Sequence, residues 1–249
     1  MKKYRKAPNI AERMALLRER CLDRKAGDGN ASIWKAIVDL KAIVDAETFR
    51  TSGHTESWQI RMGLRTKARL QNIRFEIDEL ELLAGRVSFA GHGFSKSKIE
   101  ASAKYLSKYK WPEGQTGHCA LDMSRIFKVG IKGILLELAQ RLKSSSAETK
   151  NTYQSFIYAV EGLAGMIENA KLAAGAAEKD AAGWRKKELK EIIESCERIK
   201  TDPPGTFRDA IQIIWFVDMG CAYADNAGLV VPGHLDRDCL LYTSDAADE

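Results

Sequence analysis

A histidine at position 118 stands between a glycine-rich stretch and a predicted helix, in the sequence Gly117-His118-Cys119. A histidine side chain has a pKa near neutrality, so it can transfer a proton or hydrogen-bond to a substrate oxygen. From spacing alone, a capping or packing role is the commoner one for such a histidine. Cys119 does not make a catalytic pair with it, because sequence neighbours normally point apart and such pairs are assembled in space. His118 is our candidate substrate-binding residue, and we assign no catalytic residue.

A second polar element covers residues 226–237, where two glycines and a proline flank a short apolar run. His234 and Asp236 are two residues apart, so they would share one face of an extended strand. A metal site needs a third ligand, and no residue nearby supplies one at a recognisable spacing. A structural turn with a solvated Asp236–Arg237 pair is the commoner explanation for such an element. We therefore predict no metal site.

The composition limits the class of protein. The chain has 249 residues, of which 45% are hydrophobic and 29% charged, enough for one folded domain. Its net charge of +5 is spread along the chain rather than gathered on one face, so we expect no nucleic-acid partner. The five cysteines include no Cys-x-x-Cys pair, which argues against a disulfide framework. No apolar run is long enough to cross a membrane, so we expect a cytoplasmic protein.

Hydrophobic periodicity predicts a mainly helical chain with a few short strands. We expect helices over 10–24, 33–49 and 58–70, with a break at 27–30, and a short strand or turn over 73–77. Residues 87–117 look irregular. Further helices are predicted from Asp122 or Ser124 to 142, then over 153–179 and 184–198, with no internal repeat and no linker.

A strongly apolar helix is predicted after the Pro203-Pro204-Gly205 stop. Thr206 followed by Asp209 approximates a capping box, in which side chains satisfy the first free amides of a helix. Residues 207–216 carry few polar groups. A helix of this composition is usually buried, so we expect it at the centre of the fold.

Four segments, in order, resemble the pyruvate formate-lyase-like branch of the glycyl-radical enzymes. They are RMALLRERCLDRKA, SWQIRMGLRTKARLQNIRFEIDELELLAGR, GHCALDMSRIFKVGIKGILLEL with its Gly130-x-x-Gly133 step, and WRKKELKEIIESCERIKTDPPGTFRDAIQIIWFV followed by PGHLDRD. The resemblance implies that residues 1–238 are the N-terminal part of such a domain. It also implies an α/β parent fold, a ten-stranded barrel of two half-sheets wrapped by helices.

The resemblance implies a radical mechanism. Family members store a radical on a backbone glycine, installed by a separate S-adenosylmethionine iron–sulfur activating enzyme. The radical passes to a cysteine, whose thiyl form abstracts a hydrogen atom from a small-molecule substrate. Reactions include dehydration, carbon–carbon cleavage and acyl transfer, and members are commonly homodimers. In members that eliminate water from diols, a histidine at the position of His118 contacts a substrate hydroxyl. This chain itself would bind no cofactor.

Two departures from the family pattern concern the second element. His234 stands where the family usually has arginine, and Arg237 where it usually has glutamine. Diol-eliminating relatives place serines just before the PGHLDRD stretch, where this chain has Leu229, Val230 and Val231. Apolar side chains cannot hydrogen-bond a hydroxyl, which disfavours a glycerol-type dehydratase.

The last eleven residues form a separate prediction. Residues 239–249, CLLYTSDAADE, look like a translated sequencing adapter rather than native protein. The cysteine and glycine loops of the family would lie beyond this point, so we expect a truncated enzyme that is inactive alone. One alternative is a stand-alone helical binding or scaffold protein. Another is a metal or Cys–His hydrolase that uses His118.

Overall fold

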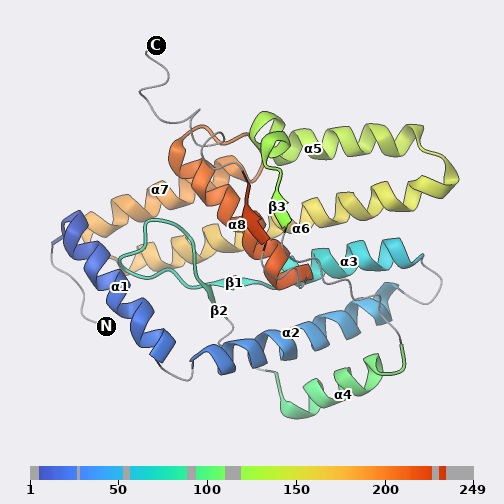
Figure 1. Ribbon diagram of the computed structural model, residues 1–249, viewed down its shortest axis with the longest axis horizontal. Helices are drawn as coiled ribbons and strands as arrows, with labels where there is room; N and C mark the ends of the chain where they lie inside the picture. The colour runs from blue at the N-terminus through green and yellow to red at the C-terminus, as the bar shows by residue number, and fades with distance from the viewer. Residues whose placement is uncertain are drawn as a thin grey trace.

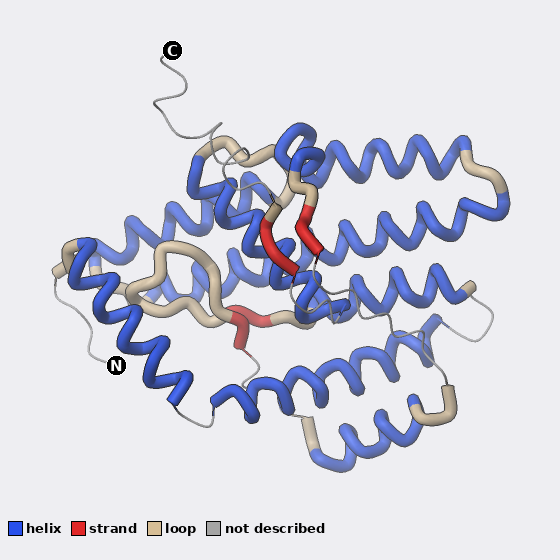
Figure 2. Tube along the Cα trace, in the orientation of Figure 1, coloured by secondary structure: helices blue, strands red, loops and turns tan. Residues whose placement is uncertain are grey.

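The structure, a computed structural model, describes residues 6–26, 29–52, 57–88, 94–109, 119–225 and 230–233. The helices of these residues are α1 (Ile10–Ala26), α2 (Gly29–Ser52), α3 (Trp58–Gln71), α4 (Lys96–Leu106), α5 (Ser124–Ser144), α6 (Ala147–Lys179), α7 (Gly183–Ile199) and α8 (Phe207–Asp225). Two pairs of short strands accompany them (Figure 2). The predicted fold class, mainly helical with a few short strands, is confirmed. No helix among these residues is both long and apolar enough to cross a membrane.

The strands pair in two different ways. β1 (Arg74–Phe75) runs antiparallel to β2 (Val87–Ser88), which closes the loop that the sequence predicted as a short strand and turn. β3 (Cys119–Leu121) runs parallel to β4 (Val230–Pro232), although roughly a hundred residues separate the two in sequence. Figure 1 shows this second pair in front of the helical layer, beside α8.

The hydrophobic core lies where α3, α6, α7 and α8 meet. α6 is the longest helix described and contacts α3, α5, α7 and α8 (Figure 1). Its buried face consists of small residues and two larger ones, Met166 and Ile167. Alanines at positions 170 and 174 have no exposed surface, so neighbouring helices approach closely there. This helical layer supports the β3–β4 pair.

α8 has one buried face and one exposed face. Ile213 and Phe216 are completely buried, and the Phe216 ring packs edge-on against Phe75 with 5.6 Å between centroids. Phe207 and Trp215 lie on the other face and are 48% and 41% exposed. The prediction of a central, buried helix is therefore confirmed for one of its faces.

Several predicted boundaries differ from the structure. α4 lies inside the stretch predicted as irregular, and the Ser95 hydroxyl caps it by accepting a hydrogen bond from the Lys98 amide. α6 begins at Ala147 instead of 153, because Ser146 caps it through the Thr149 amide. α2 already includes Gly29, inside the predicted break. α5 follows Met123 as its N-cap residue, while the Asp122 carboxylate accepts from the Ser124 amide.

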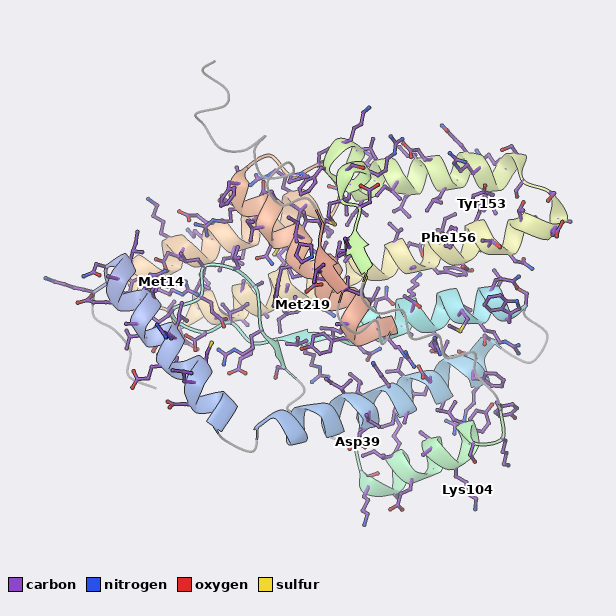
Figure 3. All side chains as sticks on the ribbon, in the orientation of Figure 1. Met14, Asp39, Lys104, Tyr153, Phe156 and Met219 are labelled. Atoms are coloured by element: carbon purple, nitrogen blue, oxygen red, sulfur yellow. The ribbon has the colours of Figure 1, made fainter. Side chains whose placement is uncertain are left out.

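α1 lies along one edge of the molecule (Figure 1). It starts with a reciprocal cap, in which Asn9 and Glu12 each accept a hydrogen bond from the other's backbone amide. Of its side chains between residues 10 and 23, Arg13 is the buried one. The apolar Met14, labelled in Figure 3, is 62% exposed. α1 thus buries a charged side chain and exposes apolar ones, whereas the core helices bury mainly apolar side chains.

Candidate functional site

The β3–β4 pair brings the two glycine-containing polar elements of the sequence together. Cys119 is opposite Val230, Ala120 opposite Val231, and Leu121 opposite Pro232. His118 directly precedes Cys119 in sequence and lies outside the described residues, as do the three other histidines. His234, Asp236 and Arg237 also lie outside them. The sequence identified both elements but not their pairing.

Gly233 is required where β4 ends. A Cβ atom at this position would lie 2.2 Å from the carbonyl oxygen of Leu121, far inside van der Waals contact. Because the clashing atom belongs to the backbone of β3, no rotamer change relieves the clash. The Pro232-Gly233 step therefore lets β3 and the end of β4 approach closely.

Gly130 fixes the helix that follows β3. Its φ of +66° and ψ of 178° interrupt α5, and this combination is accessible essentially to glycine alone. A Cβ there would lie 2.5 Å from the carbonyl carbon of Asp202. The Lys132 amide donates to the Thr201 carbonyl at 2.8 Å, so the kink docks α5 onto the turn before α8. Gly130 thus brings α5, which follows β3, against the turn before α8, the helix that precedes β4.

A buried carboxylate stabilises the start of α8. The Ser195 hydroxyl donates to Asp209 Oδ1 at 2.5 Å, and Arg198 Nε and the Gly205 amide donate to Oδ2 at 2.7 and 3.0 Å. Burial alone would raise the pKa of the Asp209 carboxyl. The hydrogen bonds from Arg198, Ser195 and the Gly205 amide outweigh burial and lower the pKa of this carboxyl. Asp209 therefore stays ionised and has a structural role.

Cys196 on α7 is not a candidate nucleophile. Its side chain is completely buried, and burial, together with the nearby charge of Asp209, raises the pKa of its thiol to about 12. A thiol must lose its proton to act as a nucleophile, and this one stays protonated at neutral pH.

Asp218 on α8 is a carboxyl that the sequence analysis passed over. Partial burial raises the pKa of its carboxyl. It is the one acidic residue in the apolar run from residue 210 to 224, and this isolation was the available signal. A carboxyl whose proton is held more firmly suits acid–base chemistry better than an ordinary exposed one. α8 also contacts β4, which makes Asp218 a secondary candidate.

Two cavities lie away from the strand pair. One, of about 340 Å³, is lined by residues of the α6–α7 turn and by Ile77, Asp78 and Glu79. The other, of about 550 Å³, lies between α1 and residues 81–85. Neither is lined by residues of β3 or β4. Within the described ranges, histidine, cysteine and carboxylate side chains form no group of three that could hold a metal ion.

A family model described as pyruvate formate lyase-like matches residues 92–248, which is more than half of the chain. The chain belongs to the pyruvate formate lyase-like family. β3, α5 to α8 and β4 all lie within the matched residues. The resemblance that the four sequence segments indicated is thereby confirmed.

A curated relative supports the membership of this family. The chain is similar to (2S)-3-sulfopropanediol dehydratase of Klebsiella oxytoca, with 30% identity over 139 residues. The alignment covers 53% of this chain and 17% of that enzyme, so the chain spans a small part of the relative's length.

Two solved structures share the fold. The B12-independent glycerol dehydratase from Clostridium butyricum superposes with a TM-score of 0.71 at 18% identity, over 88% of this chain and 37% of that one. A glycyl radical enzyme from Archaeoglobus fulgidus gives a TM-score of 0.68 at 17% identity, over 87% and 37% respectively. At these identities the likeness shows the fold alone. The curated relative is named as a dehydratase, so the family includes enzymes.

Proposed function

We propose that these residues form part of a glycyl radical lyase or dehydratase, and that the β3–β4 pair forms one wall of its substrate pocket. The observation that supports this is the parallel register of β3 and β4. It fixes Cys119, the neighbour of His118 in sequence, against Val230 of the second element. Both elements lie within the residues that match the family.

His118 is the residue to which we assign contact with substrate. Dehydration removes a hydroxyl group together with a proton, so the pocket needs a group that can hold a proton beside that oxygen. An imidazole with a pKa near neutrality can do this at physiological pH. The strand pair supports the assignment because β3 begins at the next residue and is held against β4 by backbone hydrogen bonds.

The side chains of β4 favour a substrate with few hydroxyl groups beside this strand. Val231 is 52% exposed and Val230 is partly exposed. Neighbouring residues of a strand point to opposite faces, so whichever face of β4 lines the pocket presents a valine, which cannot hydrogen-bond. The curated relative is named for a propanediol that carries a sulfonate. Arg237 follows β4 in sequence, and an arginine matches an anionic headgroup of that kind. We propose a small hydroxylated compound with an anionic group rather than glycerol.

The radical residues belong, in this proposal, to polypeptide outside these 249 residues. Residues 1–238 are, in this proposal, the N-terminal part of the family domain. The family model extends to residue 248, so the non-native origin of residues 239–249, which lie outside the described ranges, stays a prediction. The chain alone has no turnover. A radical-activating enzyme and a second copy of the full-length protein are the partners, in the reducing cytoplasm of an anaerobically growing cell.

The gene is first sequenced past codon 249, and the full-length enzyme that it encodes is then produced for the test. After anaerobic incubation with its activating enzyme and S-adenosylmethionine, we expect an organic radical signal in electron paramagnetic resonance. We also expect turnover of (2S)-3-sulfopropanediol in preference to glycerol. His118→Ala keeps the radical signal but lowers kcat/KM by about 100-fold or more. A gene that ends at codon 249 would instead favour a stand-alone helical scaffold protein, and unchanged kinetics in the variant would refute the assignment of His118.

A further inference from the structure

Two arginines attach α1 to the domain. Arg13 Nη2 lies 2.6 Å from Glu188 Oε1 on α7, and its guanidinium stacks over the Trp184 ring at 5.8 Å. About two turns further along α1, Arg20 pairs with Asp78 and also with Glu79, the latter at 3.1 Å. Both arginines therefore reach from the same helix into one acidic region of the domain.

The carboxylates that pair with α1 also form ion pairs with arginines elsewhere in the domain. Glu188 also pairs with Arg185 on α7 at 2.7 Å, and Asp78 also pairs with Arg86 at 3.0 Å. Arg185 in turn donates to the backbone carbonyl of Asp78 at 2.7 Å. These ion pairs close a network within the domain without any atom of α1. Moving α1 away leaves neither Glu188 nor Asp78 as a buried, unpaired charge, which is the costly outcome when a buried pair is broken.

Apolar packing holds α1 only weakly. A groove of about 550 Å³ separates α1 from residues 81–85, with Met14 and Leu17 on one wall and Leu82 and Leu83 on the other. Ile10 and Met14 are 83% and 62% exposed. Hydrophobic stabilisation scales with the apolar area that is removed from water, and these side chains remain largely in water.

We propose that α1 is a strap, latched by Arg13 and Arg20, which opens as a unit while the rest of the domain stays folded. Opening returns both guanidinium groups to water, which recovers their hydration, and leaves the carboxylates with Arg185 and Arg86. It also uncovers the apolar wall formed by residues 82 and 83. The opened state is therefore close in free energy to the closed one, unlike a state in which a core helix detaches.

Hydrogen exchange measured by mass spectrometry on the full chain tests this proposal. Amides of α1 are followed against those of α8 in the same sample, at about 0.01 M and about 1 M sodium chloride. Across this range the Debye length falls from about 30 Å to about 3 Å, so ion pairs near the surface weaken. We expect α1 to exchange far faster than α8 at both salt concentrations. Its rate should rise by about tenfold with salt, while that of α8 stays constant.

Three variants separate the latch from helix charge in general. Arg13→Gln and Arg20→Gln together should accelerate exchange in α1 and remove its salt dependence. Arg18→Gln is the matched control, because Arg18 lies exposed on the same helix and has no ion-pair partner among the described residues. Arg18→Gln should change neither the exchange rate of α1 nor that of α8. Glu79→Gln removes the α1 partner to which the structure gives no second arginine among the described residues. We expect it to accelerate amide exchange in α1 by less than the double variant does.

Three results would overturn the strap. One is exchange of α1 at the same rate as α8, since α1 would then open only when the whole domain unfolds. Another is an α1 rate that neither salt nor the double variant changes. The third is an equal acceleration in Arg18→Gln, which would show that net helix charge and not the latch controls opening.

Discussion

α1 and α8 are joined to the same domain by opposite kinds of interaction. The buried side chain among residues 10–23 of α1 is an arginine, whereas α8 buries Ala210, Ile213 and Phe216 completely. When an ion pair separates, water replaces the protein partner of each charge, so the net free-energy cost is small. When a helix with a buried apolar face detaches, the whole stabilisation from burying that face is lost. A helix attached by charge can detach alone, and a helix attached by packing leaves only when the core unfolds.

The largest expected effect concerns the apolar attachment of α8. Phe216→Ala should lower the free energy of unfolding by about 3–5 kcal/mol, because it removes a completely buried ring and leaves a cavity beside Phe75. Urea denaturation followed by circular dichroism measures this. Phe207→Ala, on the exposed face of the same helix, should change stability by less than about 0.5 kcal/mol. Similar losses in the two variants would contradict the two-faced description of α8.

α8 also has one charged anchor, which tests whether charge can be as firm as packing when it is buried. Asp209→Asn should cost about 2–3 kcal/mol, since the neutral amide loses the charge-assisted hydrogen bonds from Arg198 and the Ser195 hydroxyl. The pKa of Asp209 is lowered in the folded state. Its contribution is therefore complete above about pH 4, the ordinary carboxylate value, and is lost as pH falls below it. Unfolding curves collected from neutral pH downward should converge for the two proteins in acid.

The turn before α8 provides a third test, through the kink in α5. Gly130→Ala should cost about 2 kcal/mol or more, because its backbone conformation excludes a Cβ and the added methyl meets the Asp202 backbone. Gly175→Ala serves as the control in α6, where an added Cβ meets nothing within 4 Å. That substitution should stabilise the protein by about 0.5–1 kcal/mol. Thermal melts of both variants decide between these opposite signs.

The smallest effect should come from α1. Arg13→Gln is expected to lower global stability by no more than about 1 kcal/mol, because Glu188 keeps Arg185 and α1 contributes little to the core. A loss as large as that of Phe216→Ala in the same urea assay would erase the contrast between the two helices.

The sequence predicted elements better than it predicted contacts. Apolar periodicity located the helices around α1, α3 and α7 to within a few residues, because each carries an apolar stripe between breaks. It located the start of α8, which continues to Asp225, beyond the predicted apolar run of 207–216. α4 was missed because it is short and rich in lysine, although Ser95 was a legible capping signal. The start of α6 was placed at 153 because its cap, Ser146, stands only two residues after the end of α5 at Ser144, so one polar stretch ends one helix and begins the next.

The site was predictable only in part, for a physical reason. The local setting of His118 favoured a capping or packing role, and the family resemblance made it the substrate-binding candidate. It remains a prediction because it lies outside the described residues. The pairing of β3 with β4 has no local signature, since two three-residue strands far apart in sequence carry too few side chains to specify a partner. The network around Asp78 was equally invisible, because Arg20, Arg86 and Arg185 come from three separate segments.

The register of β3 and β4 also has a consequence for biosynthesis. A ribosome that has just completed β3 must add roughly a hundred more residues before β4 exists. At usual rates of translation this takes on the order of ten seconds, long enough for the intervening helices to fold on the nascent chain. During that interval β3 has polar backbone groups awaiting a partner and is vulnerable to pairing with another chain. The proposed wall of the pocket is thus completed only after α5 to α8 have been synthesised.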